Sequence, residues 1–341
     1  MTAGARWSRV LLACLGALVL VWIAYKVTTM RRMSGRVTVD TGCESDPNTA
    51  VEMSRFAPGA AAIRCEPWDV GTGATGYVWH APAPRAVLLV VTGWGDYAQR
   101  YVRGSSELIP HLLARGISVY AIDMWGNGRS PGTRGATDID DAVVDHLAAR
   151  RTLREQPLPV FVLGHSVGGL VTATSVLRDQ SGLRGMILIA PALKWGVSGG
   201  MRFVARMGGF LLPTFAVPAP PGDPADQSRD TQLHARLAAD PLYYMGPISW
   251  VTAGSGAATS HANWTRYPHV TVPVLAVSGT ADTVTEPGGI RQFIDAVRSA
   301  DKTLHLVDGG RHALLDDPPC NTEALQIVLG WLDRRLPDRP V

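Results

Sequence analysis

The feature that most constrains this chain is the stretch "PVFVLGHSVGGLVTATS", residues 159–175, where a β-rich apolar run becomes a helical pattern at one serine. Gly164 and Gly168 stand two positions before and two after Ser166, which gives the pattern Gly-x-Ser-x-Gly. A serine on a tight turn between strand and helix projects its hydroxyl beyond the sheet edge, and the glycines let the two elements approach closely. Because this context surrounds the match, the stretch predicts a nucleophile elbow centred on Ser166.

Strand and helix patterns alternate on both sides of this elbow. Continuous apolar runs, typical of buried parallel strands, lie at residues 86–93, 117–124, 158–165, 185–193, 272–279 and 302–309. Helical patterns lie between and after these runs, at residues 107–116, 138–153, 167–175, 288–300 and 321–336. The alternation predicts an α/β domain whose mostly parallel sheet is flanked by helices on both faces.

One segment breaks the alternation. Residues 192–268 include a Pro-rich stretch and contain no strong strand pattern, so they predict an inserted cap or lid. The α/β core would then consist of residues 67–191 and 269–341. Residues 37–66, which include "ESDPNT" and "APGAAA", are interpreted as a stalk and lead-in.

Residues 1–36 predict a membrane anchor. Val10 to Tyr25 is an uncharged run between Arg9 and Lys26, about 24 Å long as a helix, and one further turn brings it close to a bilayer core of about 30 Å. No small-x-small site follows the run, so an uncleaved signal anchor is favoured over a cleaved signal peptide. Basic residues on both flanks leave the orientation open. We expect a single-pass protein of a bacterial plasma membrane and favour an extracytoplasmic domain.

Charge and cysteine content exclude other classes of protein. Six basic residues and no acid lie in residues 1–36, which leaves 26 basic against 29 acidic residues downstream, so nucleic-acid binding is not expected. The cysteines are Cys14, Cys43, Cys65 and Cys320, and their spacing fits no metal site. Cys43 and Cys65 could pair outside the cytoplasm, but unpaired thiols fit equally well. No metal or organic cofactor is expected.

A serine nucleophile needs a base, and the base needs an orienting acid. Asp282 follows the apolar run 272–279, and His312 follows the next run. Both come after the ends of strands that would reach the same sheet edge as Ser166. His305 is a weaker base because it lies inside a strand. The weaker acids adjoin the histidine's own loop and are Asp308, Asp316 and Asp317.

Two backbone N–H groups are candidates for the oxyanion hole. Val167 follows Ser166 and opens the helix, so its N–H would point toward the site from a helix N-terminus. The second donor should come from the loop "TGWGDYAQRY", residues 92–101, after the first long apolar run. Gly93 and Gly95 permit a turn there, and the N–H of Trp94 is the candidate. A plain βα turn is the alternative interpretation of this loop.

The motifs together resemble the monoacylglycerol lipase and lysophospholipase branch of the α/β-hydrolase superfamily. The loop at 92–101 follows that branch's HGxGEHSxRY loosely, and "DMWGNGRS", residues 123–130, follows DxxGHGxS. The resemblance runs over about residues 67–335 and implies nucleophile Ser166, acid Asp282 and base His312. Thr92 and Asn127 stand where the branch carries histidines that support loops, and the bulk of Trp94 could narrow the acyl side.

The leading hypothesis is a serine hydrolase that cleaves a lipid-like ester through an acyl-enzyme. The segment "MRFVARMGGFLLP", residues 201–213, suits an acyl tunnel or a membrane-facing lid, although ordinary packing of the cap explains it equally well. An aminopeptidase or thioesterase could use the same triad. A catalytically inactive, membrane-tethered binding protein is the alternative outside enzymes. The sequence carries no signal of oligomeric state.

Overall fold

The computed structural model describes residues 40–56, 61–219, 222–285 and 287–338, with the isolated positions Gly16 and Leu20. Apart from those two positions, the predicted anchor at residues 1–36 lies outside the described residues. Within the described ranges, no helix has both the length and the apolar character needed to cross a bilayer. The fold is therefore that of the unit formed by residues 39–341.

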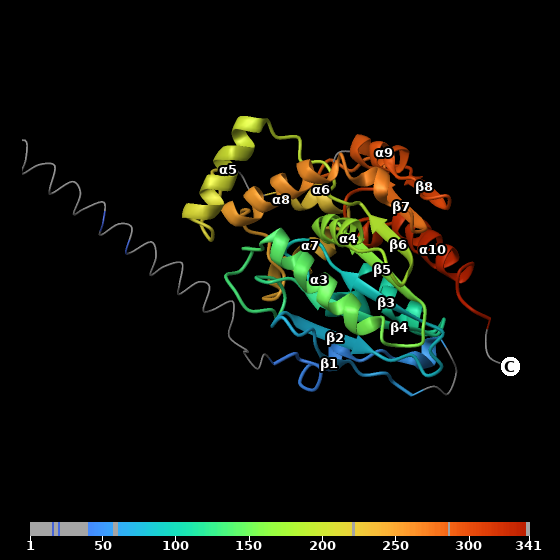
Figure 1. The fold of residues 1–341 in the computed structure, drawn as a ribbon. Coiled ribbons are helices and arrows are strands. Elements are labelled where there is room, and N and C mark those ends of the chain that lie inside the picture. The colour runs from blue at the N-terminus through green and yellow to red at the C-terminus, as the bar shows by residue number, and fades with distance from the viewer. Residues whose placement is uncertain are drawn as a thin grey trace, which may run out of the picture. The chain divides into compact units, whose positions relative to one another are not determined.

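An eight-stranded sheet forms the centre of this unit (Figure 1). Its strands are β1 (Glu66–Asp69), β2 (Thr75–Trp79), β3 (Ala86–Val91), β4 (Ile117–Asp123), β5 (Val160–His165), β6 (Leu183–Ile189), β7 (Val274–Gly279) and β8 (Lys302–Val307). They lie in the order β1-β2-β4-β3-β5-β6-β7-β8, and all neighbours from β4 to β8 are parallel. Parallel neighbours bring the carboxyl ends of β3, β5, β7 and β8 to one edge, where the site lies.

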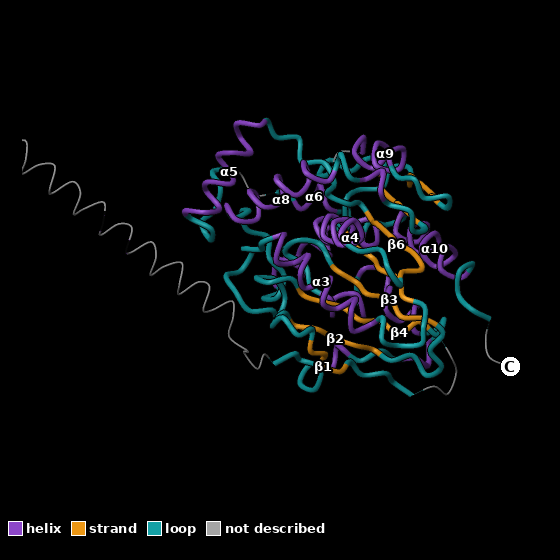
Figure 2. Tube along the Cα trace, viewed as in Figure 1, coloured by secondary structure: helices purple, strands orange, loops and turns teal. Residues whose placement is uncertain are grey.

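Helices cover both faces of the sheet (Figure 2). They are α2 (Leu108–Leu113), α3 (Ile139–Leu153), α4 (Val167–Arg178), α5 (Gly199–Leu211), α6 (Pro224–Gln227), α7 (Thr231–Ala239), α8 (Trp250–Asn263), α9 (Pro287–Ala296) and α10 (Cys320–Asp333). Leu88 and Val90 of β3 pack in one buried cluster with α2 and α10, whereas Val87 and Leu89 pack in another with α3, α4 and α9. This two-residue alternation within a continuous apolar strand confirms the prediction of a mostly parallel sheet buried on both faces.

The edge formed by β1 and β2 is antiparallel, which the strand–helix alternation did not predict. Gly76 explains part of the difference, because a Cβ there would lie 2.5 Å from the carbonyl oxygen of Trp68. The pairing therefore includes a close approach between the backbones of two neighbouring strands. A parallel sheet is therefore only a partial description, and two antiparallel pairings complete it.

Residues 37–66, interpreted above as a stalk and lead-in, pack against the domain where they are described. Val51 and Met53 are buried in the cluster that contains α2 and α10. The indole Nε1–H of Trp79, in β2, donates to the carbonyl of Thr49 at 2.9 Å. The described part of this segment thus contributes apolar side chains to the core.

The predicted insertion at residues 192–268 lies between β6 and β7 and carries α5, α6, α7 and α8. Small residues bring α5 and α8 together: a Cβ on Gly254 would lie 2.5 Å from the carbonyl oxygen of Ala205, and one on Gly208 would meet the ring of Trp250. Glycine lowers helix propensity, so the sequence signal for α8 is weak. Close helix contact compensates for that low propensity.

Candidate active site

Ser166 sits on the sharp turn between β5 and α4. Its φ and ψ angles are 53° and −119°, in a region that residues with a Cβ rarely adopt. A Cβ on Gly164 would lie 2.3 Å from the carbonyl oxygen of Gly168, and a Cβ on Gly168 would lie 2.3 Å from that of Thr92. Glycine is thus required at both positions by backbone contact, and the turn has the geometry of a nucleophile elbow.

The structure brings Ser166, His312 and Asp282 together. Nε2 of His312 lies 2.8 Å from Oγ of Ser166, and Nδ1 of the same ring lies 3.0 Å from Oδ2 of Asp282. Asp282 follows β7 and His312 follows β8, so two neighbouring strand ends present the pair to the elbow. All three residues are buried. The arrangement provides a hydroxyl, a base in hydrogen-bonding reach and a carboxylate that orients the base.

Asp282 is held as a carboxylate by the turn that follows it. Its Oδ1 accepts the N–H groups of Val284 and Thr285, each at 2.9 Å, and its Oδ2 accepts the hydroxyl of Thr285 at 2.6 Å. Burial opposes the charge, but the bonds from His312 and Thr285 lower the pKa of Asp282 below its ordinary value. A charged carboxylate can stabilise the imidazolium that forms when His312 takes a proton.

The loop after β3 lies against the elbow. A Cβ on Gly93 would lie 3.4 Å from the Cβ of Ser166. Trp94 and Val167 both line the cavity above Ser166, and Val167 is the first residue of α4. Gly95 is held from two sides, because its N–H donates to Oδ1 of Asn127 at 3.0 Å and its carbonyl accepts the N–H of a cap residue, Tyr244. The role of the Trp94 and Val167 N–H groups as oxyanion donors remains a prediction.

A cavity of about 270 Å³ opens above Ser166 between the sheet edge and the cap. Apolar side chains form one part of its wall, among them Trp94, Trp195, Ile248 and Val284. Its polar wall includes Asp96, Arg100, Gln227 and Tyr243. A cavity with both kinds of lining fits a ligand that has an apolar portion and a polar portion.

The rival residues lie elsewhere. Nε2 of His305 lies 2.9 Å from Oε1 of Glu323, on the exposed side of β8, away from the elbow. Asp308 accepts the hydroxyl of Thr280, and Asp317 accepts backbone N–H groups of its own loop and the cap. The separation of these carboxylates from the imidazole of His312 leaves Asp282 as its partner.

His165 lies beside the triad and not within it. Its Nδ1 is 3.4 Å from the hydroxyl of Tyr101, and its Nε2 is 3.4 Å from the carbonyl oxygen of His312. Burial, together with the nearby imidazole of His312, lowers the pKa of His165 to about 4. The ring is therefore neutral at neutral pH and packs beside the base, with the two imidazole centroids 5.4 Å apart.

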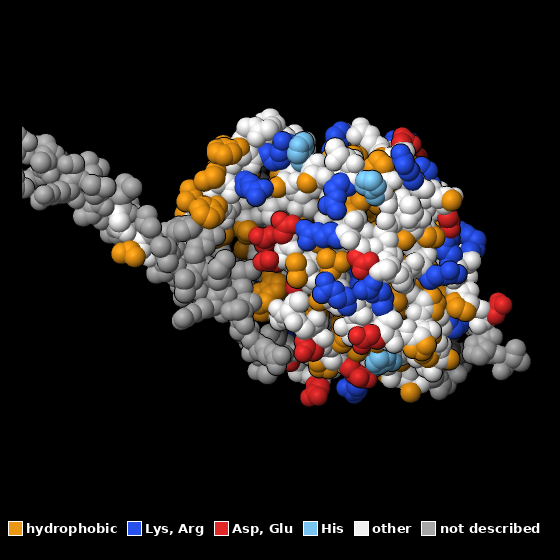
Figure 3. Space-filling view, viewed as in Figure 1, with side chains coloured by type: hydrophobic (Ala, Val, Ile, Leu, Met, Phe, Trp, Pro, Cys, Tyr) orange, Lys and Arg blue, Asp and Glu red, His pale blue; other side chains and the backbone are white. Residues whose placement is uncertain are grey.

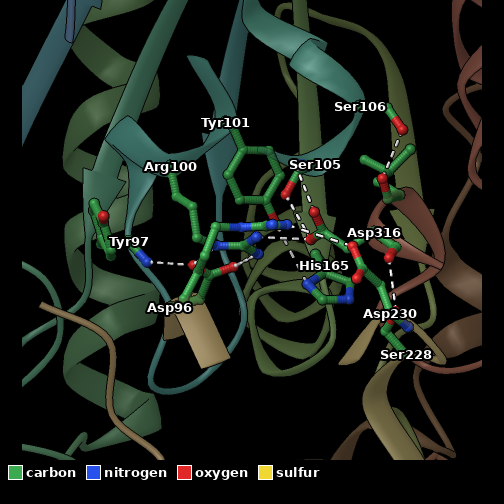
Figure 4. A network of polar contacts seen from close by, with 12 residues as sticks. Asp96, Tyr97, Arg100, Tyr101, Ser105, Ser106, His165, Ser228, Asp230 and Asp316 are labelled. Atoms are coloured by element: carbon green, nitrogen blue, oxygen red, sulfur yellow. Dashed lines mark hydrogen bonds and ion pairs between the residues drawn. The ribbon is translucent and has the colours of Figure 1, made fainter. Parts of the chain in front are cut away.

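A buried network of charges was not foreseen from the sequence (Figure 4). Arg100 forms a two-bond ion pair with Asp96 and a further bond with Asp316. The spacing of Asp96 and Arg100 by four residues is the one signal that the sequence offered. Asp316 comes from the loop of His312, far away in the sequence, and no local pattern could join it to the pair.

The structure pairs Cys43 with Cys65 in a disulfide, one of the two alternatives that the sequence left open, and Cys320 is free and buried. Within the described ranges, no group of three or more His, Cys, Asp or Glu side chains is arranged to hold a metal ion.

A family model described as serine aminopeptidase, S33, matches residues 82–319, which is more than half of the chain. A monoacylglycerol lipase of Mycolicibacterium smegmatis is 31% identical over 258 residues, which cover 73% of this chain and 88% of the relative. A monoglyceride lipase of Mus musculus is 28% identical over 261 residues, 74% of this chain and 84% of that one.

Solved structures agree with this likeness. The monoacylglycerol lipase of Paleococcus ferrophilus has a TM-score of 0.68 and 28% identity, and the match covers 77% of this chain and 99% of that one. A soluble variant of monoglyceride lipase from Saccharomyces cerevisiae has a TM-score of 0.69 with 21% identity, covering 80% and 95%, and shows the likeness of fold.

Proposed function

We propose that this chain, which belongs to the α/β-hydrolase family described as serine aminopeptidase, S33, is a lipase-like serine ester hydrolase. Its proposed substrates are monoacylglycerols or lysophospholipids. The single observation that carries this proposal is the pair of hydrogen bonds that link Ser166 to His312 and His312 to Asp282. The hydrolase class follows from the relatives and this geometry. The lipid substrate is the finer step, supported by the relatives' names and by the apolar wall of the cavity.

In the proposed reaction Ser166 Oγ attacks the ester carbonyl carbon while His312 Nε2 takes the hydroxyl proton. The carbonyl oxygen becomes an oxyanion, which the N–H groups of Trp94 and Val167 would stabilise. Breakdown of this intermediate breaks the bond to the alcohol, and the alkoxide receives the proton from His312. A water molecule then attacks the acyl-enzyme with His312 again as base, which releases the carboxylic acid and restores Ser166.

The surface of the cap supports a lipid substrate. Met201, Phe203, Val204 and Leu211 of α5 are exposed, and hydrophobic side chains gather along this helix at the upper left of Figure 3. The helix contains no acidic residue and carries arginines. Apolar residues on a basic helix favour contact with the interface of a bilayer, from which a lipid ester could reach the cavity.

Membrane anchoring and position are further parts of the proposal. Residues 10–25 would anchor the chain in a bacterial plasma membrane, with the domain on the extracytoplasmic side. The disulfide between Cys43 and Cys65 supports this side, because disulfides persist in oxidising compartments. Protease added to intact spheroplasts should digest the domain, whereas protection until lysis would assign it to the cytoplasm.

An aminopeptidase is the second reaction class, because the family description contains that word. Such an enzyme needs a free carboxylate to bind the substrate's α-ammonium group. Among the described residues that line the cavity, the acids are Asp96 and Asp223. Asp96 is occupied by Arg100, and Asp223 caps α6 through the N–H of Ala225. These engagements favour esters over peptides.

Labelling by a fluorophosphonate tests the nucleophile. Wild-type protein should be labelled on Ser166, and Ser166→Ala should not be labelled. The matched control is Ser175→Ala, a buried serine of α4 outside the triad, which should still be labelled. Absence of labelling in the wild type would overturn the proposed chemistry.

A substrate panel tests the class of ester. Monoacylglycerols of several lengths, lysophospholipids, short p-nitrophenyl esters and amino-acid p-nitroanilides would compete under the same conditions. We expect the highest kcat/KM for a lipid ester, and faster cleavage of the anilides would favour the aminopeptidase.

A further inference from the structure

The turn η4 (Ser105–Glu107) has a left-handed backbone at three successive residues, none of which is glycine. The φ angles of Ser105, Ser106 and Glu107 are 48°, 57° and 52°. Residues with a Cβ disfavour this region, and they persist there only where the surrounding contacts over-determine the backbone. The groups that hold the turn therefore indicate what the fold gains from it.

The loop that carries His312 holds this turn. Oδ1 of Asp316 accepts the N–H of Ser105 at 2.7 Å, and its Oδ2 accepts the hydroxyl of the same serine at 3.0 Å. The hydroxyl of Ser106 donates to the carbonyl of Leu315 at 2.6 Å. Both acceptors belong to η6 (Leu314–Asp316), which begins two residues after His312. The turn is thus hydrogen-bonded to the loop that carries His312.

The same carboxylate also binds Arg100 (Figure 4). Nη1 of Arg100 donates to Oδ2 of Asp316 at 2.7 Å, and its Nε and Nη2 donate to the two carboxylate oxygens of Asp96, each at 2.7 Å. Burial opposes the charge of Arg100, but Asp316 and Asp96 raise its pKa well above the ordinary value. Asp96 lies two residues after Trp94, so this guanidinium joins the oxyanion loop to the loop of His312.

We propose that Asp316 is a positioning residue, which keeps His312 within hydrogen-bonding distance of Ser166 by fastening the histidine's loop to Arg100 and to the left-handed turn. The inference rests on the proposed function, since it concerns the base of that reaction. Two carboxylate oxygens are required, because Oδ1 serves Ser105 N–H while Oδ2 serves Arg100. An amide has one oxygen, and its NH2 group would face one of these donors.

The test is Asp316→Asn in the full chain. We expect kcat for p-nitrophenyl butyrate, per active site, to fall about 10-fold or more, with KM within about 3-fold of wild type. The rate constant of fluorophosphonate labelling should fall by a similar factor, because it depends on the same base. Asp301→Asn is the matched control: it breaks an ion pair with Arg335 just before β8, at the other end of the strand, and should keep both rates.

A lower melting temperature with unchanged kcat per labelled site would overturn the proposal, because the carboxylate would then only stabilise the fold. Ser106→Ala provides a milder variant if Asp316→Asn does not fold, since it removes the bond to Leu315 alone. A fall of kcat of about 2- to 5-fold there supports the proposal, and an unchanged kcat overturns it. Failure of the wild type to react with fluorophosphonate would overturn the proposed function itself and is recognised by that result.

Discussion

The two halves of the cap make opposite kinds of contact. The α5 half, residues 199–211, has a single buried side chain, Ala205, and exposes large apolar residues. Phe203, for example, is 67% exposed. The α6 half, residues 224–229, is hydrogen-bonded to the loop that carries His312. The N–H of Ala313 donates to the carbonyl of Gln227 at 2.7 Å, and the hydroxyl of Ser228 donates to the carbonyl of Asp316 at 2.7 Å. One inserted segment thus combines an outward apolar surface with a brace for the active site.

This difference assigns lipid access and support of the active site to separate parts of the cap. A movement of α5 alone would leave the bonds between residues 225–229 and the loop of His312 intact. A movement of the α6 half would break those bonds and displace the base. We therefore expect changes on α5 to affect lipid access, and changes at the α6 contact to affect hydrolysis of every ester.

The largest effect should come from Asp317→Asn. Asp317 is fully buried, and its two oxygens accept the N–H groups of Arg229, in the cap, and of Arg311, each at 2.8 Å. An amide cannot accept both, so the cap and the base's loop would separate. We expect kcat for soluble and lipid esters alike to fall about 100-fold, since a displacement of about 1 Å has such an effect. Steady-state assays on both substrate types measure it.

The control for this variant is Asp226→Asn, which removes a bond to Thr283 and keeps the backbone contacts of the cap. A selective loss on lipid substrates in Asp317→Asn would contradict the division between the two halves.

The next effect is the pH dependence of folding stability that His165, beside the loop of His312, should cause. His165 contacts the carbonyl of His312, and its pKa of about 4 lies below the value of about 6.5 in an unfolded chain. Between these values the unfolded chain binds a proton that the folded chain does not, so stability falls as pH drops from about 6.5 to 4. At pH 5 this imidazole alone accounts for a loss of about 2 kcal/mol. His165→Asn should remove that contribution, whereas the contribution of His146, whose pKa burial also lowers, should remain.

Urea unfolding at pH 7.5 and pH 5 measures this difference. His305→Asn is the control, because the side chain of His305 in β8 is 41% accessible to solvent and its replacement should leave the acid sensitivity unchanged. Equal pH dependence of the wild type and His165→Asn would show that the buried imidazole does not cause it.

The division within the cap also explains what could be predicted from the sequence. The elbow and the order of Ser166, Asp282 and His312 depend on local signals, namely buried apolar runs and glycines at fixed positions beside the serine. Parallel strands then bring the strand ends to one edge. The contacts of the α6 half join groups almost ninety residues apart in the sequence and leave no local pattern.

Other features were hidden for related reasons. The helix α8 contains several glycine, serine and threonine residues, which lower its intrinsic helix propensity, and it forms because α5 packs closely against it. The left-handed turn at Ser105–Glu107 lacks glycine, the residue that usually signals such a backbone. The charges that hold it lie in another loop. Tertiary contact decides each of these features.

A smaller effect is expected on the α5 half. The double variant Phe203→Ser and Leu211→Ser removes two exposed apolar side chains. Hydrolysis of monoacylglycerol in anionic vesicles should fall about 10-fold, because less apolar surface enters the interface, while hydrolysis of a soluble short ester should not change. Val144→Ser, an exposed position of α3, is the control. An equal loss on the soluble ester would contradict the assignment of α5 to lipid access.

The smallest effect should occur where the core meets the cap, at Trp94. Its indole Nε1–H donates to the carbonyl of Gly135 at 3.0 Å, and its ring lies edge-on to Tyr244, with centroids 5.3 Å apart. These contacts hold a large ring in the apolar wall of the cavity, where it limits the space for an acyl chain. In Trp94→Ala the ratio of kcat/KM for dodecanoyl over butanoyl esters should rise about 3- to 5-fold, a modest change typical of apolar contacts. Trp68→Ala, far from the cavity lining, should keep the wild-type ratio, and an unchanged ratio in Trp94→Ala would mean that the chain runs along another wall.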